Sequence, residues 1–368
     1  MVPTKERILL GPGPSLMSPE VMRALAAPML SHLDPQFVEI MDDVRARLGR
    51  VLQAPEGSLV FAVSGTGTSA METAVANTVA PGTRVLSVVT GYFADRLAQI
   101  AARYGGEVTR VEAEWGRAID PDQVKKALPL SRADVVTIVH AETSTGVLNP
   151  IQSVAAIARE HDALTIVDAV TSLGGMPLDV AGWGLDVVYS CSQKCLGAPS
   201  GMSPIVFTPR ALERKVACRS FYLDISLLED YWIRRKYHHT ISASLVYALR
   251  EALVGVEKEG LHERWARHER NHLAFVRTLD NLGLSLLPLP AERLWTLNAV
   301  RVPEGVDDAA VRRHLLQESN IEIGAGLGPL AGKVFRVGLM GTSSSQELVD
   351  LLGKALENAL NTVVQGLH

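Results

Sequence analysis

Short apolar runs alternate with amphipathic stretches from residue 58 to residue 168, and this alternation constrains the fold more than any other feature of the chain. The runs are rich in valine, leucine and isoleucine, and segments with helical spacing of apolar residues separate them. Parallel strands need such crossover helices, and strands buried on both faces are continuously apolar. The pattern predicts an α/β protein with a mainly parallel, doubly wound sheet. The expected strands are residues 58–64, 84–90, 107–112, 134–140 and 163–170.

The sequence on either side of this alternation differs in character. Residues 8–19, ILLGPGPSLMSP, hold too many glycines and prolines for a helix or a central strand, so we expect an extended arm. A long helical pattern over residues 245–283 leads to a C-terminal part in which strands and helices mix. We therefore expect an N-terminal arm, a large α/β domain and a smaller α+β domain, comprising residues 1–20, 21–250 and 251–368.

Lys194 is the most informative single residue. It lies between apolar runs at 185–189 and 203–207, a pattern typical of strand, loop and strand. A lysine buried at a strand end must find a partner, lose its charge or form a covalent bond, because an unpaired buried ammonium is costly. Asp168, which ends another predicted strand, could simply form an ion pair with it. The two residues also suit pyridoxal phosphate, whose aldehyde a lysine binds and whose pyridine nitrogen an aspartate keeps protonated.

A glycine-rich turn joins the first predicted strand to a helix. Its sequence, SGTGTS over residues 64–69, offers backbone N–H groups, hydroxyls and the positive end of a helix dipole to an anion. Gly65, Gly67 and Ala70 also match a relaxed dinucleotide fingerprint, but the next strand ends without the acidic residue that such a site requires. A phosphate-binding turn is therefore favoured over a dinucleotide loop, and an ordinary helix start is the third interpretation.

Two further strand ends carry side chains suited to a ligand site, because strand ends line the ligand crevice in sheets of this kind. Phe93 follows the strand at 84–90, and its ring could stack on a pyridine ring or pack in the core. The segment HAETSTG, residues 140–146, places hydroxyl groups after the strand at 134–140. These hydroxyls could contact a ligand or cap the loop.

Composition and charge exclude several classes of function. The net charge is −4, so the chain has no basic footprint for nucleic acid, and the stretch ERWARHERNH at 263–272 is interpreted as a solvated helix face. Cys191, Cys195 and Cys218 are too few for a disulfide framework and lack a second Cys/His pair at zinc spacing, so we expect them to pack. No apolar stretch has the length of a signal-peptide core or a membrane span. A cytoplasmic protein without a metal or membrane site is expected.

Several short motifs stand in a fixed order along the chain: LLGPGPS, SGTGTSA, HAETSTGV, VDAVTSLGG, SCSQKCLGAPSG, YHHT and KVFRVGLMG. Together they closely resemble the class V pyridoxal-phosphate aminotransferases, and within them the alanine– and serine–glyoxylate type. The resemblance covers nearly the whole chain. It implies fold type I, a homodimer, and a ping-pong transfer of an amino group from a small amino acid to a 2-oxo acid, glyoxylate.

The resemblance also implies roles for individual residues. Lys194 would form the Schiff base with pyridoxal 5′-phosphate, and Asp168 would pair with its pyridine nitrogen. Arg336 would bind the substrate carboxylate through its planar fork, with Gly13 and Ser144 beside it. The other implied cofactor contacts are Thr66, Gly67, Thr68 and Gln193 at the phosphate, Phe93 on the ring, Ser144 near the ring hydroxyl, and Tyr237 and Thr240 of a neighbouring subunit at the phosphate.

Some features separate this chain from particular relatives. Thr68 stands where some relatives have histidine, so the phosphate contacts differ in kind. Relatives that act on ureidoglycine share SGTGTSAMET but carry asparagine where Tyr237 stands, which favours the alanine or serine type over that alternative. A cysteine desulfurase would need a cysteine within residues 320–333, and a nicotinamide-dependent dehydrogenase would need the missing ribose-binding acid. Both are therefore disfavoured.

Overall fold

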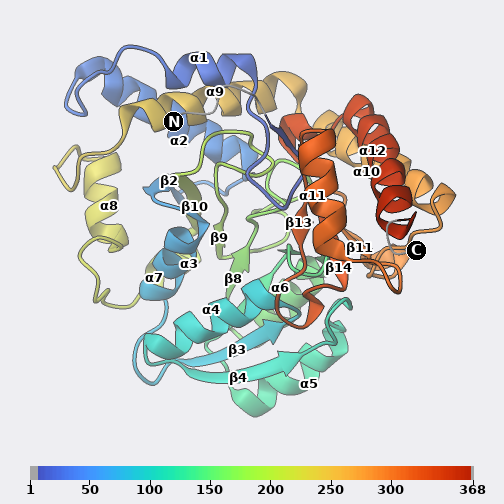
Figure 1. Ribbon diagram of the computed structural model, residues 1–368. Coiled ribbons are helices and arrows are strands. Elements are labelled where there is room, and N and C mark those ends of the chain that lie inside the picture. Colours follow the sequence, from blue (N-terminus) through green and yellow to red (C-terminus); the bar gives the residue numbers. More distant parts are fainter. Residues whose placement is uncertain (1–6, 366–368) are drawn as a thin grey trace.

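The computed structural model describes residues 7–365, and a seven-stranded sheet runs through its centre (Figure 1). The strand order is β2-β10-β9-β8-β5-β3-β4. Neighbouring strands are parallel except β10, which runs antiparallel to β2 and β9. The predicted mainly parallel sheet is therefore confirmed. The strands are β2 Leu59–Ser64, β3 Arg84–Val89, β4 Glu107–Glu112, β5 Val135–Val139, β8 Leu164–Asp168, β9 Val187–Tyr189 and β10 Met202–Phe207.

Helices cover this sheet, and every residue of β5, β8, β9 and β10 is buried. Three of the helices begin with a residue whose side-chain oxygen caps the first turn, followed by proline. Ser18, Asp34 and Asp120 each accept a hydrogen bond from a backbone N–H of the first turn, and the proline fits the first helical position. The helices of this part are α1 Pro19–Leu25, α2 Pro35–Val51, α3 Gly67–Ala76, α4 Tyr92–Arg103, α5 Pro121–Ser131, α6 Ile151–Glu160, α7 Pro209–Glu213, α8 Ile225–Trp232 and α9 Ala243–Glu259.

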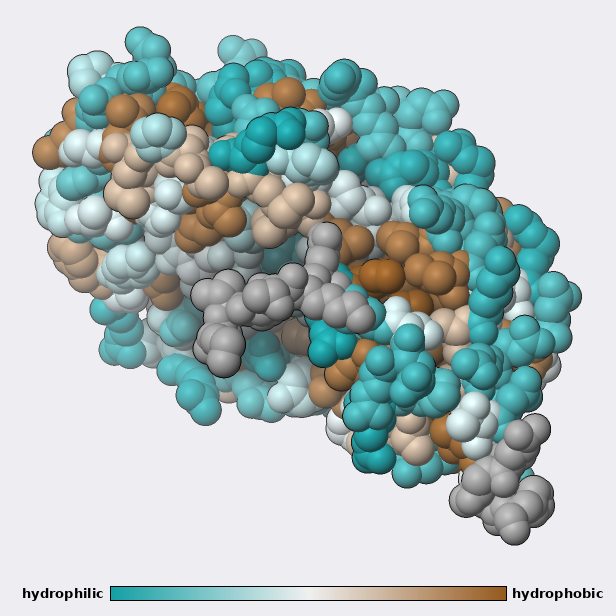
Figure 2. All heavy atoms as spheres, turned by 45° about the horizontal axis from the view of Figure 1, so that its top comes forward, coloured by the Kyte–Doolittle hydropathy of each residue, from teal (hydrophilic) through white to brown (hydrophobic). Residues whose placement is uncertain are grey.

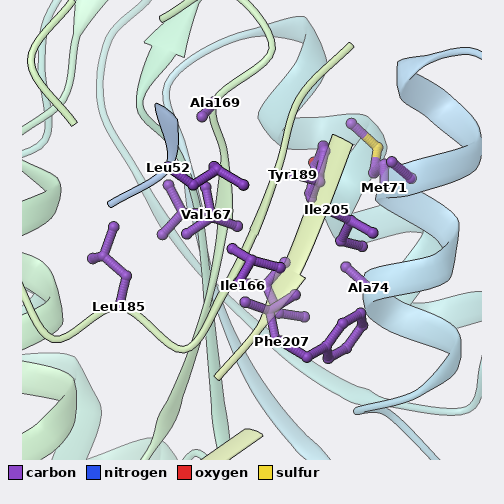
Figure 3. Packing of buried hydrophobic residues seen from close by; sticks show 14 of the residues in the cluster. Leu52, Met71, Ala74, Ile166, Val167, Ala169, Leu185, Tyr189, Ile205 and Phe207 are labelled. Carbon is purple, nitrogen blue, oxygen red and sulfur yellow. The ribbon is translucent and has the colours of Figure 1, made fainter. Parts of the chain in front are cut away.

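Buried hydrophobic residues fix α3 on the sheet. Met71 and Ala74 point from this helix toward Ile205 and Phe207 of β10, and all four side chains are at most 2% exposed (Figure 3). Burying a side chain as large as methionine, isoleucine or phenylalanine contributes about 1.5–3 kcal/mol. The first turn of α3 is thereby held just beyond the end of β2, at the glycine-rich turn.

The C-terminal elements gather on one side of the molecule (Figure 1, orange to red). They enclose a hydrophobic cluster of their own, whereas α9 contributes to the cluster of the large sheet as far as Val256. The domain boundary at residue 250 stays a prediction. The elements are α10 Leu261–Asn281, β11 Leu297–Arg301, α11 Asp308–Glu318, β12 Ile321–Glu322, β13 Gly324–Ala325, β14 Val334–Gly338 and α12 Gln346–Gln365.

The N-terminal arm joins these two parts of the molecule. Its short strand β1, Ile8–Leu9, pairs in parallel with β12, and Leu10 is fully buried in the C-terminal cluster. Farther along, the Ser15 hydroxyl donates a hydrogen bond to the carbonyl oxygen of Lys194 at 2.7 Å. An extended arm was expected over residues 8–19, and it lies across the loop that carries the lysine. Residues 1–6 of the predicted arm lie outside the described residues.

The long helical pattern is confirmed as helix, but one expectation within it was wrong. The pattern forms two helices, α9 and α10, because the chain turns at Gly260, whose φ is +83°. The stretch at 263–272 is not a solvated face, since Arg264 and His268 are 6% and 0% exposed. Arg264 donates to the carbonyl oxygen of Cys195 at 2.6 Å, and His268 accepts from the backbone N–H of Gly341 at 3.0 Å. These distant backbone groups replace water for the buried polar side chains. No helix within residues 7–365 has both the length and the hydropathy to cross a membrane.

Candidate active site

A cavity of about 140 Å³ lies at the carboxyl ends of the central strands. Val139 ends β5, Asp168 ends β8, and Cys191 follows β9 by two residues, and all three line this cavity. This is the sheet edge at which open α/β proteins bind ligands. The wall contains Thr66, Gly67, Thr68, Phe93, Asp168, Gln193 and Lys194 of the predicted site, together with Met71, Arg96, Thr143 and Val170.

Asp168 is 3% exposed and is held by two donors. Its Oδ1 accepts a hydrogen bond from the backbone N–H of Val170 at 2.8 Å, and its Oδ2 accepts one from the Tyr189 hydroxyl at 2.9 Å. Burial nevertheless raises the pKa of this carboxyl to about 7, because the two donors do not replace the lost water. A positive charge placed next to Asp168 would favour the ionised carboxylate.

Lys194 lies in the loop after β9, with its amine turned toward the N-terminal arm. The Nζ atom donates a hydrogen bond to the carbonyl oxygen of Pro12, and a Cβ added to Gly13 would collide with the lysine side chain. Within residues 7–365, no carboxylate oxygen lies within 4.0 Å of Nζ, so Lys194 and Asp168 form no direct ion pair. Burial lowers the pKa of the amine, which favours the neutral, nucleophilic form.

The start of α3 is open to an anion. Thr66 occupies the N-cap position, yet its side chain makes no capping hydrogen bond. A Cβ added to Gly67 would lie 3.2 Å from a methyl group of Val170, so the backbone passes close to the wall there. The Oε1 atom of Gln193 is buried and has no hydrogen-bond partner within residues 7–365. Unpaired N–H groups at a helix start, with an amide side chain across from them, can hold a phosphate.

Phe93 is fixed beside the cavity by a fully buried acid, Glu142. The backbone N–H groups of Phe93 and Ala94 donate to the two carboxylate oxygens at 3.3 and 3.1 Å. The Ser144 hydroxyl donates to the same carboxylate at 2.5 Å and accepts from the first N–H of α4 at 3.0 Å. Ser144 is therefore engaged at the helix start and does not line the cavity, whereas Thr143 does. The contact of Ser144 with the ring hydroxyl stays a prediction, and the Thr143 hydroxyl lies 2.5 Å from that of Thr171.

Arg336 lies behind the cavity wall, in the middle of β14, and is 7% exposed. Its Nε donates to the carbonyl oxygen of Ala325 at 2.6 Å, and its Nη1 lies 3.4 Å from the carbonyl oxygen of Thr143. Burial lowers the pKa of the guanidinium to about 10, so it stays protonated at neutral pH. No carboxylate lies within 4.0 Å of it in the described part of the chain. Its hydrogen-bond partners are neutral carbonyl groups, and the charge of Glu142 partly offsets the effect of burial on its pKa.

Tyr237 and Thr240 do not reach the cavity of their own chain. Tyr237 is 65% exposed, and its hydroxyl lies 3.4 Å from that of Thr240. One of the two histidines between them points the other way, because Nε2 of His239 lies 2.7 Å from the Ser64 hydroxyl at the end of β2. This segment is thus anchored beside the glycine-rich turn and presents its tyrosine outward.

Three residues of the site were not singled out from the sequence. Tyr189 stands opposite Asp168 in the register of β8 and β9, but the sequence does not say which strands pair. Glu142 is part of the motif HAETSTG, yet nothing in the motif indicates that it holds α4. Arg96 follows Phe93 by three residues, a helical spacing that could have placed it on the same face.

Comparisons with known proteins agree with one another. The family model for aminotransferase class-V matches residues 15–351. An alanine–glyoxylate aminotransferase of Drosophila melanogaster is 38% identical, over 100% of this chain and 95% of the relative. An (S)-ureidoglycine–glyoxylate transaminase of Bacillus subtilis (strain 168) is 34% identical, over 97% and 91% respectively. A solved alanine–glyoxylate aminotransferase from Nostoc sp. has a TM-score of 0.95 at 46% identity and covers 98% of this chain and 96% of that one.

Proposed function

This chain belongs to the class V aminotransferase family and is a transaminase of fold type I, and from that premise we propose that it moves an amino group from alanine or serine to glyoxylate by a ping-pong mechanism. Glyoxylate appears in the names of both curated relatives described above. The observation that carries the proposal is Arg336, a buried guanidinium beside the cavity with no acid within 4.0 Å in residues 7–365. The carboxylate of a small 2-oxo acid would supply the missing partner.

The residues of the cavity fit pyridoxal 5′-phosphate, on which this family depends. When bound, this cofactor supplies an aldehyde that takes up the amino group and a ring that withdraws electrons from the reacting carbon. Lys194 would hold the cofactor covalently, and its lowered pKa supports that role. Asp168 would face the pyridine nitrogen, because a carboxyl with a pKa of about 7 gains most from a neighbouring positive charge.

The other cofactor contacts are proposed from the open groups on the wall. The uncapped start of α3, with Thr66, Gly67 and Thr68, would bind the phosphate together with Gln193, whose side-chain NH₂ group would donate to it. Phe93 would stack on the ring, and Thr143 would take the place near the ring hydroxyl that was expected for Ser144. These assignments account for the uncapped helix start.

The proton transfers are assigned to Lys194. Its Nζ would accept the proton from the α-carbon of the amino donor and return a proton in the second half-reaction. A neutral amine is required for the first step, and burial in the cavity favours that form. The arm supports the geometry, because the Pro12 carbonyl oxygen accepts a hydrogen bond from Nζ and Gly13 leaves room for the side chain.

The surroundings of Arg336 favour a small substrate. Gly324 of β13 lies directly opposite Arg336 in the sheet, and a Cβ on Gly324 would collide with Pro12 of the arm. A Cβ on Gly326 would collide with the carbonyl group of Leu330. The backbone beside β14 is therefore closely packed, and we infer that this suits glyoxylate better than a bulky keto acid.

We propose a homodimer in which Tyr237 and Thr240 reach the phosphate of the neighbouring subunit. Support comes from the exposure of Tyr237 and from the hydrophobic residues Met29 and Leu33, which are 77% and 65% exposed. Figure 2 shows hydrophobic side chains among hydrophilic ones on the side of the molecule that carries α1 and α9. A cytoplasmic location is proposed as well, because the cysteines are free thiols, which suits a reducing compartment.

The shared site can be tested by mixing two inactive variants. Lys194→Ala should be inactive because it lacks the amine, and a Tyr237→Phe/Thr240→Ala double variant should bind the cofactor weakly. In mixed dimers one site combines an intact lysine with an intact partner segment, so activity should rise above that of either parent. Mixed dimers that form but show no gain would contradict the sharing.

Substrate identity is tested by a screen of donors and acceptors on the purified holoenzyme. Each half-reaction is followed separately through the visible absorbance of the bound cofactor. Alanine or serine should convert the enzyme rapidly, and glyoxylate should restore it. A clear preference for 2-oxoglutarate over glyoxylate, or conversion by ureidoglycine alone, would contradict the assignment, and the second result would favour the ureidoglycine type.

A further inference from the structure

Three cationic side chains lie on or beside the cavity, and none of them has an acidic partner in the described part of the chain. Lys194 and Arg96 form part of the wall, and Arg336 donates to the carbonyl oxygen of Thr143, which also lines it. No carboxylate oxygen of residues 7–365 lies within 4.0 Å of their side-chain nitrogens. The proposed function uses Lys194 and Arg336, but it leaves Arg96 without a role.

Arg96 reaches from α4 to the first turn of α3. Its Nη1 donates a hydrogen bond to the Thr68 hydroxyl at 3.2 Å. Its guanidinium carbon lies 5.2 Å from the ring centres of both Tyr92 and Phe93, within the range of a cation–π contact. The positive charge is thereby held between an aromatic wall of the cavity and the helix start that is open to an anion.

The acids that could neutralise Arg96 are engaged elsewhere. Asp95, the next residue on the helix, forms an ion pair with Arg110 at 2.7 Å and accepts a hydrogen bond from Gln99 at 2.6 Å. Glu142 lies fully buried at the start of α4, where backbone N–H groups and a serine hydroxyl occupy its oxygens. The charge of Arg96 therefore stays uncompensated, and it adds to the positive end of the α3 dipole.

We propose that Arg96 is a binding residue for the phosphate group of the cofactor and acts together with the first turn of α3. The inference rests on the proposed function, because it requires pyridoxal 5′-phosphate in this cavity. A guanidinium is suited to the task, since its fork can donate to a phosphate oxygen while another nitrogen keeps the bond to Thr68. The contact with Phe93 keeps the long side chain in place.

The test compares two ligands that differ only in the phosphate, pyridoxal 5′-phosphate and pyridoxal. Dissociation constants are measured by absorbance on cofactor-free wild type, Arg96→Gln, Arg96→Lys and the control Arg103→Gln, an exposed arginine at the end of α4. Arg96→Gln should weaken binding of the phosphorylated ligand by about 10- to 100-fold, because a charge-assisted hydrogen bond is lost. Binding of pyridoxal should hardly change. Arg96→Lys should give an intermediate loss, and Arg103→Gln none.

The comparison of the two ligands separates phosphate binding from ring positioning. Equal weakening of both ligands in Arg96→Gln would mean that the arginine only supports Phe93, and unchanged binding of both would mean that it has no role. Either result overturns the inference. If Arg96→Gln does not fold, as judged by circular dichroism, an unchanged ratio of the two affinities in Arg96→Lys overturns it instead. Wild-type protein that binds neither ligand would overturn the proposed function itself, a result distinct from the others.

Discussion

The acidic and basic side chains around the cavity differ in the hydrogen-bond partners that the protein gives them. Asp168 accepts hydrogen bonds from a backbone N–H and a tyrosine hydroxyl, and Glu142 accepts them at both of its oxygens. Lys194 and Arg336 donate only to neutral carbonyl oxygens, and no acid lies within 4.0 Å of them in residues 7–365. The acids are held by the protein, whereas the cations keep their charge available.

This difference indicates what the cavity is complementary to. A buried acid without donors would be costly, so the start of α4 and the strand end at β8 supply them. Hydrogen-bond donors and positive charges that have no acidic partner in the described residues are suited to bind an anionic ligand. The two classes should therefore respond differently to neutral substitutions. Replacing an acid should change the stability of the cofactor-free protein, and replacing a cation should mainly change ligand binding.

The largest effect is expected for Asp168→Asn in the holoenzyme. An amide cannot balance a positive ring nitrogen, so turnover should fall by about a thousandfold, or ~4 kcal/mol in the barrier. Steady-state kinetics on the purified variant measures the loss. Asp350→Asn, an exposed acid on α12, is the matched control and should keep full activity. Wild-type turnover in Asp168→Asn would show that the acid is not a part of the chemistry.

The same substitution should stabilise the cofactor-free protein at high pH. The folded-state pKa of Asp168, about 7, lies above the ordinary value of 3.8, so the stability from the protonated acid is lost as pH rises through 7. Asparagine has no such loss. Its advantage should reach up to about 4 kcal/mol at pH 8, because one pKa unit corresponds to about 1.4 kcal/mol, and it should shrink steadily toward pH 5. Urea unfolding at several pH values measures this trend, and a difference independent of pH would contradict it.

Glu142→Gln should have the opposite effect on stability. The amide keeps one carbonyl oxygen but turns an NH₂ group toward backbone N–H donors, which leaves them unpaired at about 1–3 kcal/mol. Burial raises the pKa of Glu142, so its own contribution falls as pH rises, and the deficit of the variant should be largest at low pH. Urea unfolding of this variant and of Glu357→Gln, an exposed control on α12, tests the contrast. A variant more stable than wild type would mean that the hydrogen bonds of Glu142 do not hold the start of α4.

The sequence was informative where local pattern decides the structure. Apolar runs such as residues 84–90 form strands whatever lies far away, and the central sheet followed from them. The pattern misled at Arg264 and His268, because charged residues at helical spacing usually face water. Here distant backbone groups at Cys195 and Gly341 meet them, and no local pattern encodes such a contact.

Some residues of the site can likewise be predicted from the local sequence, whereas others depend on contacts between distant segments. Lys194 and Asp168 could be placed from their strand ends, but the hydroxyl of Tyr189 beside Asp168 depends on which strands pair. Thr143 and Ser144 are neighbours, and only the fold decides which of them faces the cavity. The short strands β6 Ala141–Glu142 and β7 Val147–Leu148 make this choice, because the turn between them places Thr143 in the cavity wall and directs the Ser144 hydroxyl to the start of α4.

The smallest effect is expected for the cation behind the wall, in Arg336→Lys. Lysine keeps the positive charge but loses the planar fork, so one of two hydrogen bonds to a substrate carboxylate is lost. The apparent KM for glyoxylate and for the amino donor should both rise about tenfold, since both carry the same carboxylate, while kcat changes less. Arg301→Lys on β11, where the side chain is exposed, is the control and should leave both constants unchanged.

The stability of the cofactor-free Arg336→Lys variant should stay close to that of wild type, because Arg336 has no acid within 4.0 Å in residues 7–365. Unchanged saturation by both substrates would remove Arg336 from the site, and a large loss of stability would mean that this cation, like the acids, is held for the sake of the fold.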